Sequence, residues 1–161
     1  MISIPLTKGF SSIIDDIDGD LAQFKWHVIV GEWGNYARRK QIINGKQKTF
    51  YMHREILGRI LGRNLDRKEL VDHKNRNGLD NQRDNIRLAT TAQNAMNSGI
   101  RKNKTSPYKG VYWVKRDSKW ASTIKVGGKS FYLGIFVNPE DAHKAYCEAS
   151  EKYHGEFARF E

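Results

Sequence analysis

Short runs of apolar and β-branched residues alternate with polar positions through the first third of the chain. Runs such as ISIPLT, FSSIID, WHVIV and KTFYM are separated by Gly, Asp and Asn, a pattern typical of short β-strands. The region from Ile2 to about Tyr51 is therefore predicted to be a β-rich platform. Apolar positions at helical spacing then predict one short helix over residues 53–61, ended by Gly62.

The pattern changes between Glu69 and Asn97. LVDH and NIRLAT have the composition of strands and are joined by a long polar loop that contains Gly78. Thr90 or Thr91 can cap a helix that follows directly. The segment 69–97 is thus predicted to run strand, loop, strand, helix.

A second small domain is predicted at the C-terminal end. Residues 99–107 are polar and basic without periodicity, as in a linker. Strand-like runs follow at 109–115, 119–126 and 129–136, the last two joined by a Gly127-Gly128 turn signal, and Asn138 and Pro139 can open a helix. We expect an α+β protein with domains 1–98 and 108–161, the second a three-stranded antiparallel sheet packed on one helix.

The charge balance points to a polyanionic partner. The 161 residues carry a formal net charge of +10, with a sequence pI of about 9.7, which favours attraction to nucleic acid, although a merely basic surface has the same signature. No stretch approaches the ~20 apolar residues of a membrane span, and no signal peptide is recognisable. We therefore expect a cytoplasmic protein with no membrane partner. Cys147 is the only cysteine, so we expect neither an intrachain disulfide nor a structural zinc site.

The segment 69–97 holds groups suited to phosphodiester hydrolysis, which needs a base, a cation and positioning groups. His73 can accept a proton from water in its neutral form. Asp72, Asn85 and Asn94 offer the hard oxygens that suit Mg²⁺. In order and spacing these residues resemble the HNH endonuclease family, specifically its phage and mobile-intron homing branch, with Asn in the third motif position.

The resemblance implies a ββα-metal core over residues 69–97 and a role for each residue. His73 is the general base, Asp72 and Asn94 bind Mg²⁺ or another divalent ion such as Mn²⁺, and Asn85 orients the His73 imidazole. His53 is interpreted as structural or as a support for the residues of the site, rather than as a catalytic group. Further predictions concern the loop: Arg76, Arg83 and Arg87 are candidates for contacts with phosphates beside the cut, and Asn75, Asn77 and Asn81 are interpreted as loop formers rather than ligands.

Residues 101–129 form a strongly basic segment, which contains nine Lys and Arg residues and a single acidic residue, Asp117. On the strand 119–126, Thr123 and Lys125 alternate with apolar residues, which predicts one polar, basic face. The run Tyr108–Phe160 resembles the Apetala-two/ethylene-response-factor DNA-binding domain. By position, the resemblance and the basic hairpin together predict these DNA-binding residues: Lys109, Tyr112, Lys115, Arg116, Thr123, Lys125, Ser130 and Tyr132.

The sequence thus favours a metal-dependent endonuclease, homing or nicking, that acts on double-stranded DNA held by its C-terminal domain. We expect a monomer or weak dimer encoded by a phage or mobile element and acting in a bacterial host. One alternative is a DNA-binding transcriptional regulator whose nuclease half is inactive. An RNA-binding protein has less support, because no stacking motif of the usual RNA modules is present.

Overall fold

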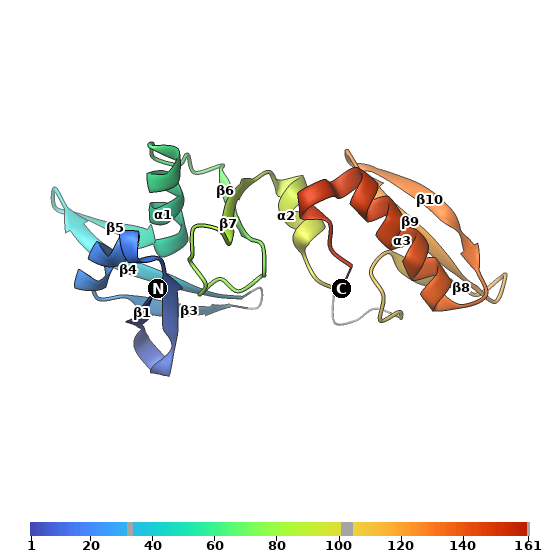
Figure 1. Ribbon diagram of the computed structural model, residues 1–161, viewed down its shortest axis with the longest axis horizontal. Helices are drawn as coiled ribbons and strands as arrows, with labels where there is room; N and C mark the ends of the chain where they lie inside the picture. The colour runs from blue at the N-terminus through green and yellow to red at the C-terminus, as the bar shows by residue number, and fades with distance from the viewer. Residues whose placement is uncertain (32–33, 101–104, 161) are drawn as a thin grey trace. The chain divides into compact units, whose positions relative to one another are not determined.

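The computed structural model describes residues 1–31, 34–100 and 105–160, which form two compact units, Met1–Thr90 and Thr91–Glu161 (Figure 1). The helix that the sequence groups with the nuclease motif is counted with the second unit. Residues 101–104 of the predicted linker lie outside the described residues. The domain limits 1–98, 99–107 and 108–161 therefore stay a prediction.

The first unit is β-rich, as predicted. A hairpin of β1 (Ile2–Pro5) and β2 (Ser11–Ile14) comes first, with a 3-10 turn η1 (Thr7–Gly9) inside it. The 3-10 helix η2 (Asp16–Gln23) leads to an antiparallel sheet of β3 (His27–Gly31), β4 (Gly34–Ile43) and β5 (Lys46–Tyr51). Helix α1 (Met52–Leu61) and the two-stranded sheet of β6 (Leu70–His73) and β7 (Ile86–Ala89) complete it.

The core of this unit joins all of these parts. Trp26 lies fully buried among Ile4, Ile14 and Met52, and its indole N–H donates to the Leu21 carbonyl at 2.8 Å. Each aliphatic side chain buried in this way contributes roughly 1.5–3 kcal/mol. The core therefore holds the β1–β2 hairpin against α1, which precedes the β6–β7 segment.

Helix α1 ends where the sequence predicts. Gly62 adopts a left-handed conformation with φ of 64°, and its N–H bonds back to Arg59 and Gly58. This conformation is easy only for a residue without a side chain. The chain can then turn towards β6.

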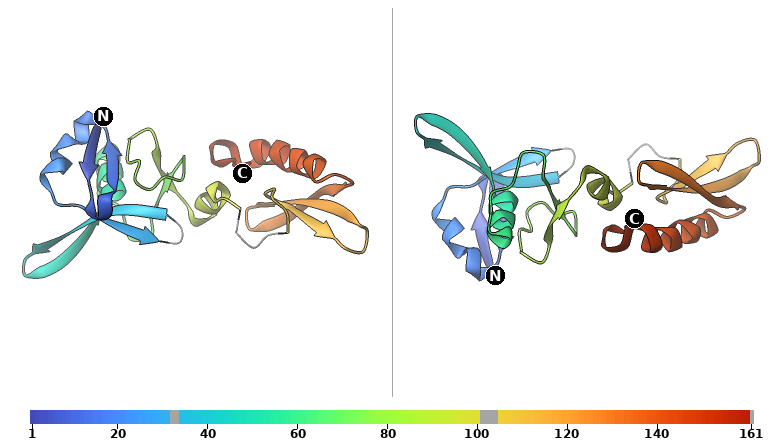
Figure 2. Two further views of the ribbon diagram at one scale, coloured as in Figure 1. Left: turned by 90° about the horizontal axis from the view of Figure 1, so that it is seen from below. Right: turned by 90° about the horizontal axis from the view of Figure 1, so that it is seen from above.

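The second unit confirms the predicted sheet and helix. Helix α2 (Thr91–Asn97) is followed by the antiparallel sheet β8 (Val111–Val114), β9 (Lys119–Val126) and β10 (Lys129–Phe136), with β9 in the centre. Helix α3 (Pro139–His154) lies along one face of this sheet (Figure 2), and η3 (Gly155–Phe157) follows it. The α+β fold class is therefore correct.

Close packing of α3 depends on a glycine before β8. A Cβ at Gly110 would lie 2.1 Å from the Tyr146 ring, and Gly110 has φ of +75°. Tyr146, Ile124 and Ala149 form the buried cluster between helix and sheet. Helix α3 therefore covers one face of the sheet, and the opposite face does not pack against this helix.

Candidate functional site

The polar loop between β6 and β7 is shaped by its own asparagines. Asn75 accepts the N–H of Asn77 at 2.8 Å, and Asn77 accepts the N–H of Leu79 at 3.1 Å. Such side-chain bonds two residues along the chain are characteristic of Asx turns. Asn75 and Asn77 are therefore loop formers, as predicted.

Gly78 allows this loop to lie against the sheet of the first unit. A Cβ at Gly78 would come within 2.4 Å of the Asn35 carbonyl and 2.6 Å of the Tyr36 ring. Tyr36 in turn lies beside the imidazole of His73, with 6.0 Å between ring centroids. The loop and strand β4 thus enclose the histidine.

His73 ends β6 with only 5% of its surface exposed. Its Nε2 lies 3.1 Å from Oδ1 of Asn81, and its ring centroid lies 5.4 Å from that of His53. Burial lowers the pKa of His73, and the bond with Asn81 and the charges of Asp72 and Asp80 offset only part of this effect. The imidazole is therefore neutral at pH 7, the form that can accept a proton.

The sequence indicates that Asn81 is a loop former, but in the structure its side-chain oxygen also contacts the His73 ring. It is fully buried, and its Nδ2 donates to the Ser12 hydroxyl at 2.7 Å. The main chain is anchored as well: the N–H of Asn81 bonds the Ile13 carbonyl at 2.8 Å. No local pattern pairs Asn81 with a serine 69 positions earlier, so sequence reasoning missed this contact.

Asp72 lies directly before His73 with 4% of its surface exposed. Its Oδ2 forms an ion pair with Nε of Arg87 at 2.8 Å, and the two residues are register partners across β6 and β7. Buried carboxylates require such a partner or a metal ion. The contact of Arg87 with phosphate stays a prediction, since its described bond is to Asp72.

Asn85 and Asn94, the other two motif residues, do not contact His73 in any described hydrogen bond. Asn85 donates to Asn75 at 3.0 Å and to the Asp80 carbonyl at 2.7 Å, so it ties the two ends of the loop together. Its orienting effect on His73 stays a prediction, because the described partner of Nε2 is Asn81. Asn94 is exposed on α2, and its role as a metal ligand is likewise untested.

The two loop arginines differ in their surroundings. Arg76 is exposed in the loop, in a left-handed conformation with φ of 63°, and its predicted contact with phosphate stays open. Arg83 instead donates two hydrogen bonds to the carboxylate of the fully buried Asp18, from Nε at 2.8 Å and from Nη2 at 2.9 Å. Arg83 therefore has a structural partner.

The donor set fits a hard divalent cation. Among the described residues, no group of three or more His, Cys, Asp and Glu side chains lies close enough to hold a metal ion. Mg²⁺ does not require one, since it commonly takes one or two protein oxygens and completes its shell with water and phosphate. A buried carboxylate at Asp72 and an amide oxygen suit it.

His53 is a half-buried neighbour of His73. Burial lowers its pKa to about 3, and the nearby charges of His73 and Arg54 add to the effect. Its Nδ1 is buried without a hydrogen-bond partner in the part of the chain that the structure describes, and its ring lies 5.4 Å from that of Tyr36. His53 is thus a neutral packing residue here, in line with the structural role expected for it.

The second unit gathers polar side chains on the sheet face opposite α3. Register pairs Lys125 with Ser130 and Thr123 with Tyr132. Cross-strand partners share a face, and Ile124, which packs on α3, alternates with both Thr123 and Lys125. Tyr112 belongs to the same face through its partner Ala121. The predicted DNA contacts on the three strands therefore share one surface: Tyr112, Thr123, Lys125, Ser130 and Tyr132.

Three predicted cations lie off that surface. Lys109 donates its ammonium to the Met96 and Ser98 carbonyls, the latter at 2.8 Å, and so holds the end of α2. Lys115 and Arg116 lie in the β8–β9 turn, where Arg116 pairs with Asp117 at 2.7 Å. Of these three residues, only the exposed Lys115 has neither a described side-chain hydrogen bond nor a described ion pair.

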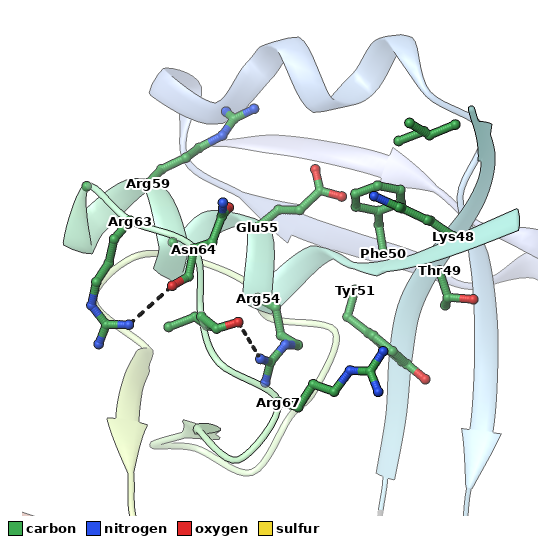
Figure 3. A pocket seen from close by; sticks show the side chains of 14 residues that line it. Lys48, Thr49, Phe50, Tyr51, Arg54, Glu55, Arg59, Arg63, Asn64 and Arg67 are labelled. Carbon is green, nitrogen blue, oxygen red and sulfur yellow. Dashed lines mark hydrogen bonds between the residues drawn. The ribbon is translucent and has the colours of Figure 1, made fainter. Parts of the chain in front are cut away.

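A hollow between β5 and α1 is also rich in cations (Figure 3). The Arg54 guanidinium donates hydrogen bonds to the backbone carbonyls of Glu69 and Asp66, both at 2.6 Å. Arg63 forms an ion pair with the Glu69 carboxylate. These bonds fix the connection from α1 to β6. The hollow contains none of the predicted catalytic residues, and we interpret its arginines as structural.

Comparison with known proteins assigns a family to each region. The HNH endonuclease family model matches residues 50–96, and the AP2 domain model matches residues 106–156. Protein 3.8 of Escherichia phage T7 is 34% identical over 90 residues, 56% of this chain and 74% of that protein. An uncharacterized HNH endonuclease, L560, of Acanthamoeba polyphaga mimivirus is 33% identical over 107 residues, 66% of this chain and 54% of the relative.

The C-terminal unit has a plant relative. The AP2-like ethylene-responsive transcription factor TOE2 of Arabidopsis thaliana is 39% identical over 54 residues, 34% of this chain and 11% of that protein. No solved structure matches the chain. Within the described residues, no helix is long and apolar enough to cross a bilayer.

Proposed function

Since the chain belongs to the HNH endonuclease family and carries an AP2 DNA-binding domain, we propose that it is a metal-dependent endonuclease that hydrolyses phosphodiester bonds of double-stranded DNA. The C-terminal sheet holds the substrate while the segment around Asp72 and His73 cuts it. We further propose a homing or nicking role in a phage or mobile element, supported by the phage and viral relatives.

The observation that carries the proposal is the state of His73. It is a buried, neutral imidazole that directly follows a buried carboxylate, and its Nε2 lies 3.1 Å from Oδ1 of Asn81. A fixed neutral imidazole is suited to take a proton from water as that water attacks phosphorus. Arg87 balances the Asp72 charge beside it.

We assign the metal ion to Asp72 and, from the family resemblance, to Asn94. When bound, Mg²⁺ or Mn²⁺ would neutralise charge on the phosphate and on the leaving oxygen. The residues of the chain have separate tasks. His73 moves the proton, and the loop held by Asn85 and Gly78 keeps the imidazole enclosed.

Cleavage of supercoiled plasmids bearing phage or host genomic fragments tests the proposal. We expect relaxed or linear product with Mg²⁺ or Mn²⁺ and none with EDTA, because the ion stabilises the transition state. Relaxed product alone indicates nicking by a monomer, and linear product indicates cutting of both strands. Tight binding with no cutting of any fragment in either metal would instead favour the transcriptional-regulator alternative.

Lys125→Ala tests the sheet surface as the DNA-holding element. Removing one phosphate contact should weaken affinity roughly three- to tenfold at about 0.1 M salt and reduce the slope of log K against log salt by about 0.9. Fluorescence anisotropy with duplex DNA across a salt series measures both quantities.

Lys144→Ala is the matched control, since Lys144 is exposed on α3, which covers the other sheet face. It removes the same charge and should leave the slope nearly unchanged. Equal effects of the two variants would mean that the protein responds to net charge and that the sheet surface is only solvated.

A further inference from the structure

We propose that Lys109 is a clamp through which the C-terminal DNA-binding domain keeps α2 in order, and that this order supports metal-dependent cutting. Helix α2 carries Asn94, so the inference rests on the proposed function for the assignment of the metal ion to that residue. Lys109 is a positioning residue in it, because it acts on the cutting step only through the helix. The DNA-binding domain thus contributes to cutting as well as to holding DNA.

Helix α2 is too short to be stable by itself. It spans only the seven residues Thr91–Asn97, of which Asn97 is the one that is buried. Isolated helices shorter than about 12–15 residues are marginal in water, because few hydrogen bonds compensate for the cost of nucleation. The order of α2 therefore depends on contacts with residues outside it.

The C-terminal end of α2 is held by Lys109. The Lys109 ammonium donates to the carbonyls of Met96 and Ser98, the latter at 2.8 Å. The last carbonyls of a helix have no partner within it, and the negative end of the helix dipole favours a cation there. Ser98 satisfies the Ala95 carbonyl locally, through its hydroxyl at 2.6 Å. Lys109, which lies 11 positions beyond Ser98 in the chain, is the long-range part of this cap.

The backbone on both sides of Lys109 is fixed to the core elements of the DNA-binding domain. Tyr108 stacks on His143 of α3, with 4.6 Å between ring centroids. The Gly110 carbonyl accepts the N–H of Thr123 in β9 at 2.9 Å. Since neither neighbour can move without breaking a contact, the Lys109 side chain reaches α2 from a rigid base.

These contacts join the polar sheet face to α2 without interruption. Thr123 lies on the face that we propose holds DNA, its N–H is bonded to the residue after Lys109, and Lys109 is bonded to the helix. Energetic coupling between sites is carried by such chains of packed and hydrogen-bonded groups. Helix α2 also lies beside η3, at the end of α3. Loss of the clamp should therefore loosen the end of α2 without unfolding the domain.

The clamp gives Lys109 a different task from the one that the family resemblance implies. By position in the DNA-binding domain Lys109 is a DNA contact, but in the structure its ammonium is bonded to α2. A contact with phosphate contributes to DNA affinity and to its salt dependence. A clamp contributes to the order of α2 and leaves both of these quantities unchanged, so experiment can separate the two roles.

Hydrogen–deuterium exchange of the metal-free full chain tests the clamp directly. Lys109→Met keeps most of the side-chain length and removes the charge and the donors. Losing two charge-assisted hydrogen bonds should make amide exchange over residues 91–98 at least about tenfold faster, while peptides from β9 and α3 keep the parental rate. Lys144→Met is the matched control, because Lys144 is exposed on α3, and it should exchange as the parent does. Lys109→Ala provides a second variant if exchange in β9 and α3 shows that Lys109→Met is not folded.

The metal dependence of cutting is the second readout. The apparent affinity of a partly disordered helix for its ligand is reduced by the fraction that is ordered. Lys109→Met should therefore raise the Mn²⁺ concentration for half-maximal cleavage about three- to tenfold, with the rate at saturating Mn²⁺ within about twofold of the parent. Its affinity for duplex DNA and the slope of log K against log salt should stay parental. A residue that only stabilised the domain would not shift the metal dependence alone.

The outcomes separate this inference from the proposed function. Parental exchange over residues 91–98 in a folded variant would overturn the clamp, and a smaller salt slope in that variant would assign Lys109 to phosphate instead. Faster exchange with an unchanged Mn²⁺ dependence would overturn the link between the order of α2 and cutting. A protein that cuts no DNA in any metal would overturn the proposed function, whereas exchange in the metal-free protein would still establish or refute the clamp.

Discussion

His73→Ala is expected to lower the rate of DNA cleavage by a factor of about 10²–10⁴ while leaving DNA affinity nearly unchanged, because general-base catalysis contributes about that factor. The affinity should survive, since the polar sheet face that we propose holds the DNA lies in the second unit. Single-turnover cleavage and equilibrium binding to the same duplex, both with divalent metal, measure the two quantities separately.

His27→Ala is the control for this prediction. His27 is an exposed histidine at the start of β3, outside the predicted site, and its loss should leave cleavage at the parental rate. His73→Gln provides a second variant that fills more of the buried space. A His73 variant that cuts as fast as the parent would remove this residue as the base.

The order of elements could be predicted because each has a local signal. Gly127 and Gly128 stand between β9 and β10 with positive φ, and Pro139 opens α3. The 3-10 helix η2 had no such signal. It follows a strand-like run, and its carboxylates and Gly19 form no apolar repeat, so the sequence did not predict it.

The site was predictable only in part, for a similar reason. Asp72 and His73 are adjacent in the chain and were predicted together, whereas the sequence assigned Arg87 to phosphate and the structure pairs it with Asp72 across two neighbouring strands. The contact of Asn81 with Ser12 depends instead on how the loop packs against β2. Only the three-dimensional structure brings these two residues together.

The buried carboxylate of Asp18 is the second position with a large expected effect. It has no exposed surface and binds Arg83 at 2.8 Å and Arg59 at 3.1 Å. Burial alone would raise the pKa of Asp18, but the hydrogen bonds and charges of the two arginines outweigh it, and the net pKa is lowered. The ionised carboxylate thus ties η2 to α1 and to the loop between β6 and β7.

Asp18→Asn should destabilise the first unit by about 2–4 kcal/mol. Breaking a fully buried ion pair costs about 3–5 kcal/mol, and the value is reduced here because the Arg83 and Arg59 side chains are 30% and 34% exposed. Urea unfolding read by pulse hydrogen–deuterium exchange, in peptides from residues 1–90, measures the loss. Peptides from α3 serve as an internal reference.

Asp20→Asn is the matched control, because Asp20 also pairs with Arg59, at 2.6 Å, but is 52% exposed. It should cost less than about 1 kcal/mol.

The pH dependence of the stability of the first unit follows from the lowered pKa of Asp18. Its stabilisation is fully present above the ordinary Asp pKa of about 3.9 and is lost as pH falls below it, since the unfolded chain takes up the proton first. The difference between parent and Asp18→Asn should therefore be constant near neutral pH and shrink below about pH 4. A difference that persists there unchanged would mean that side-chain packing, not the charge of Asp18, stabilises the unit.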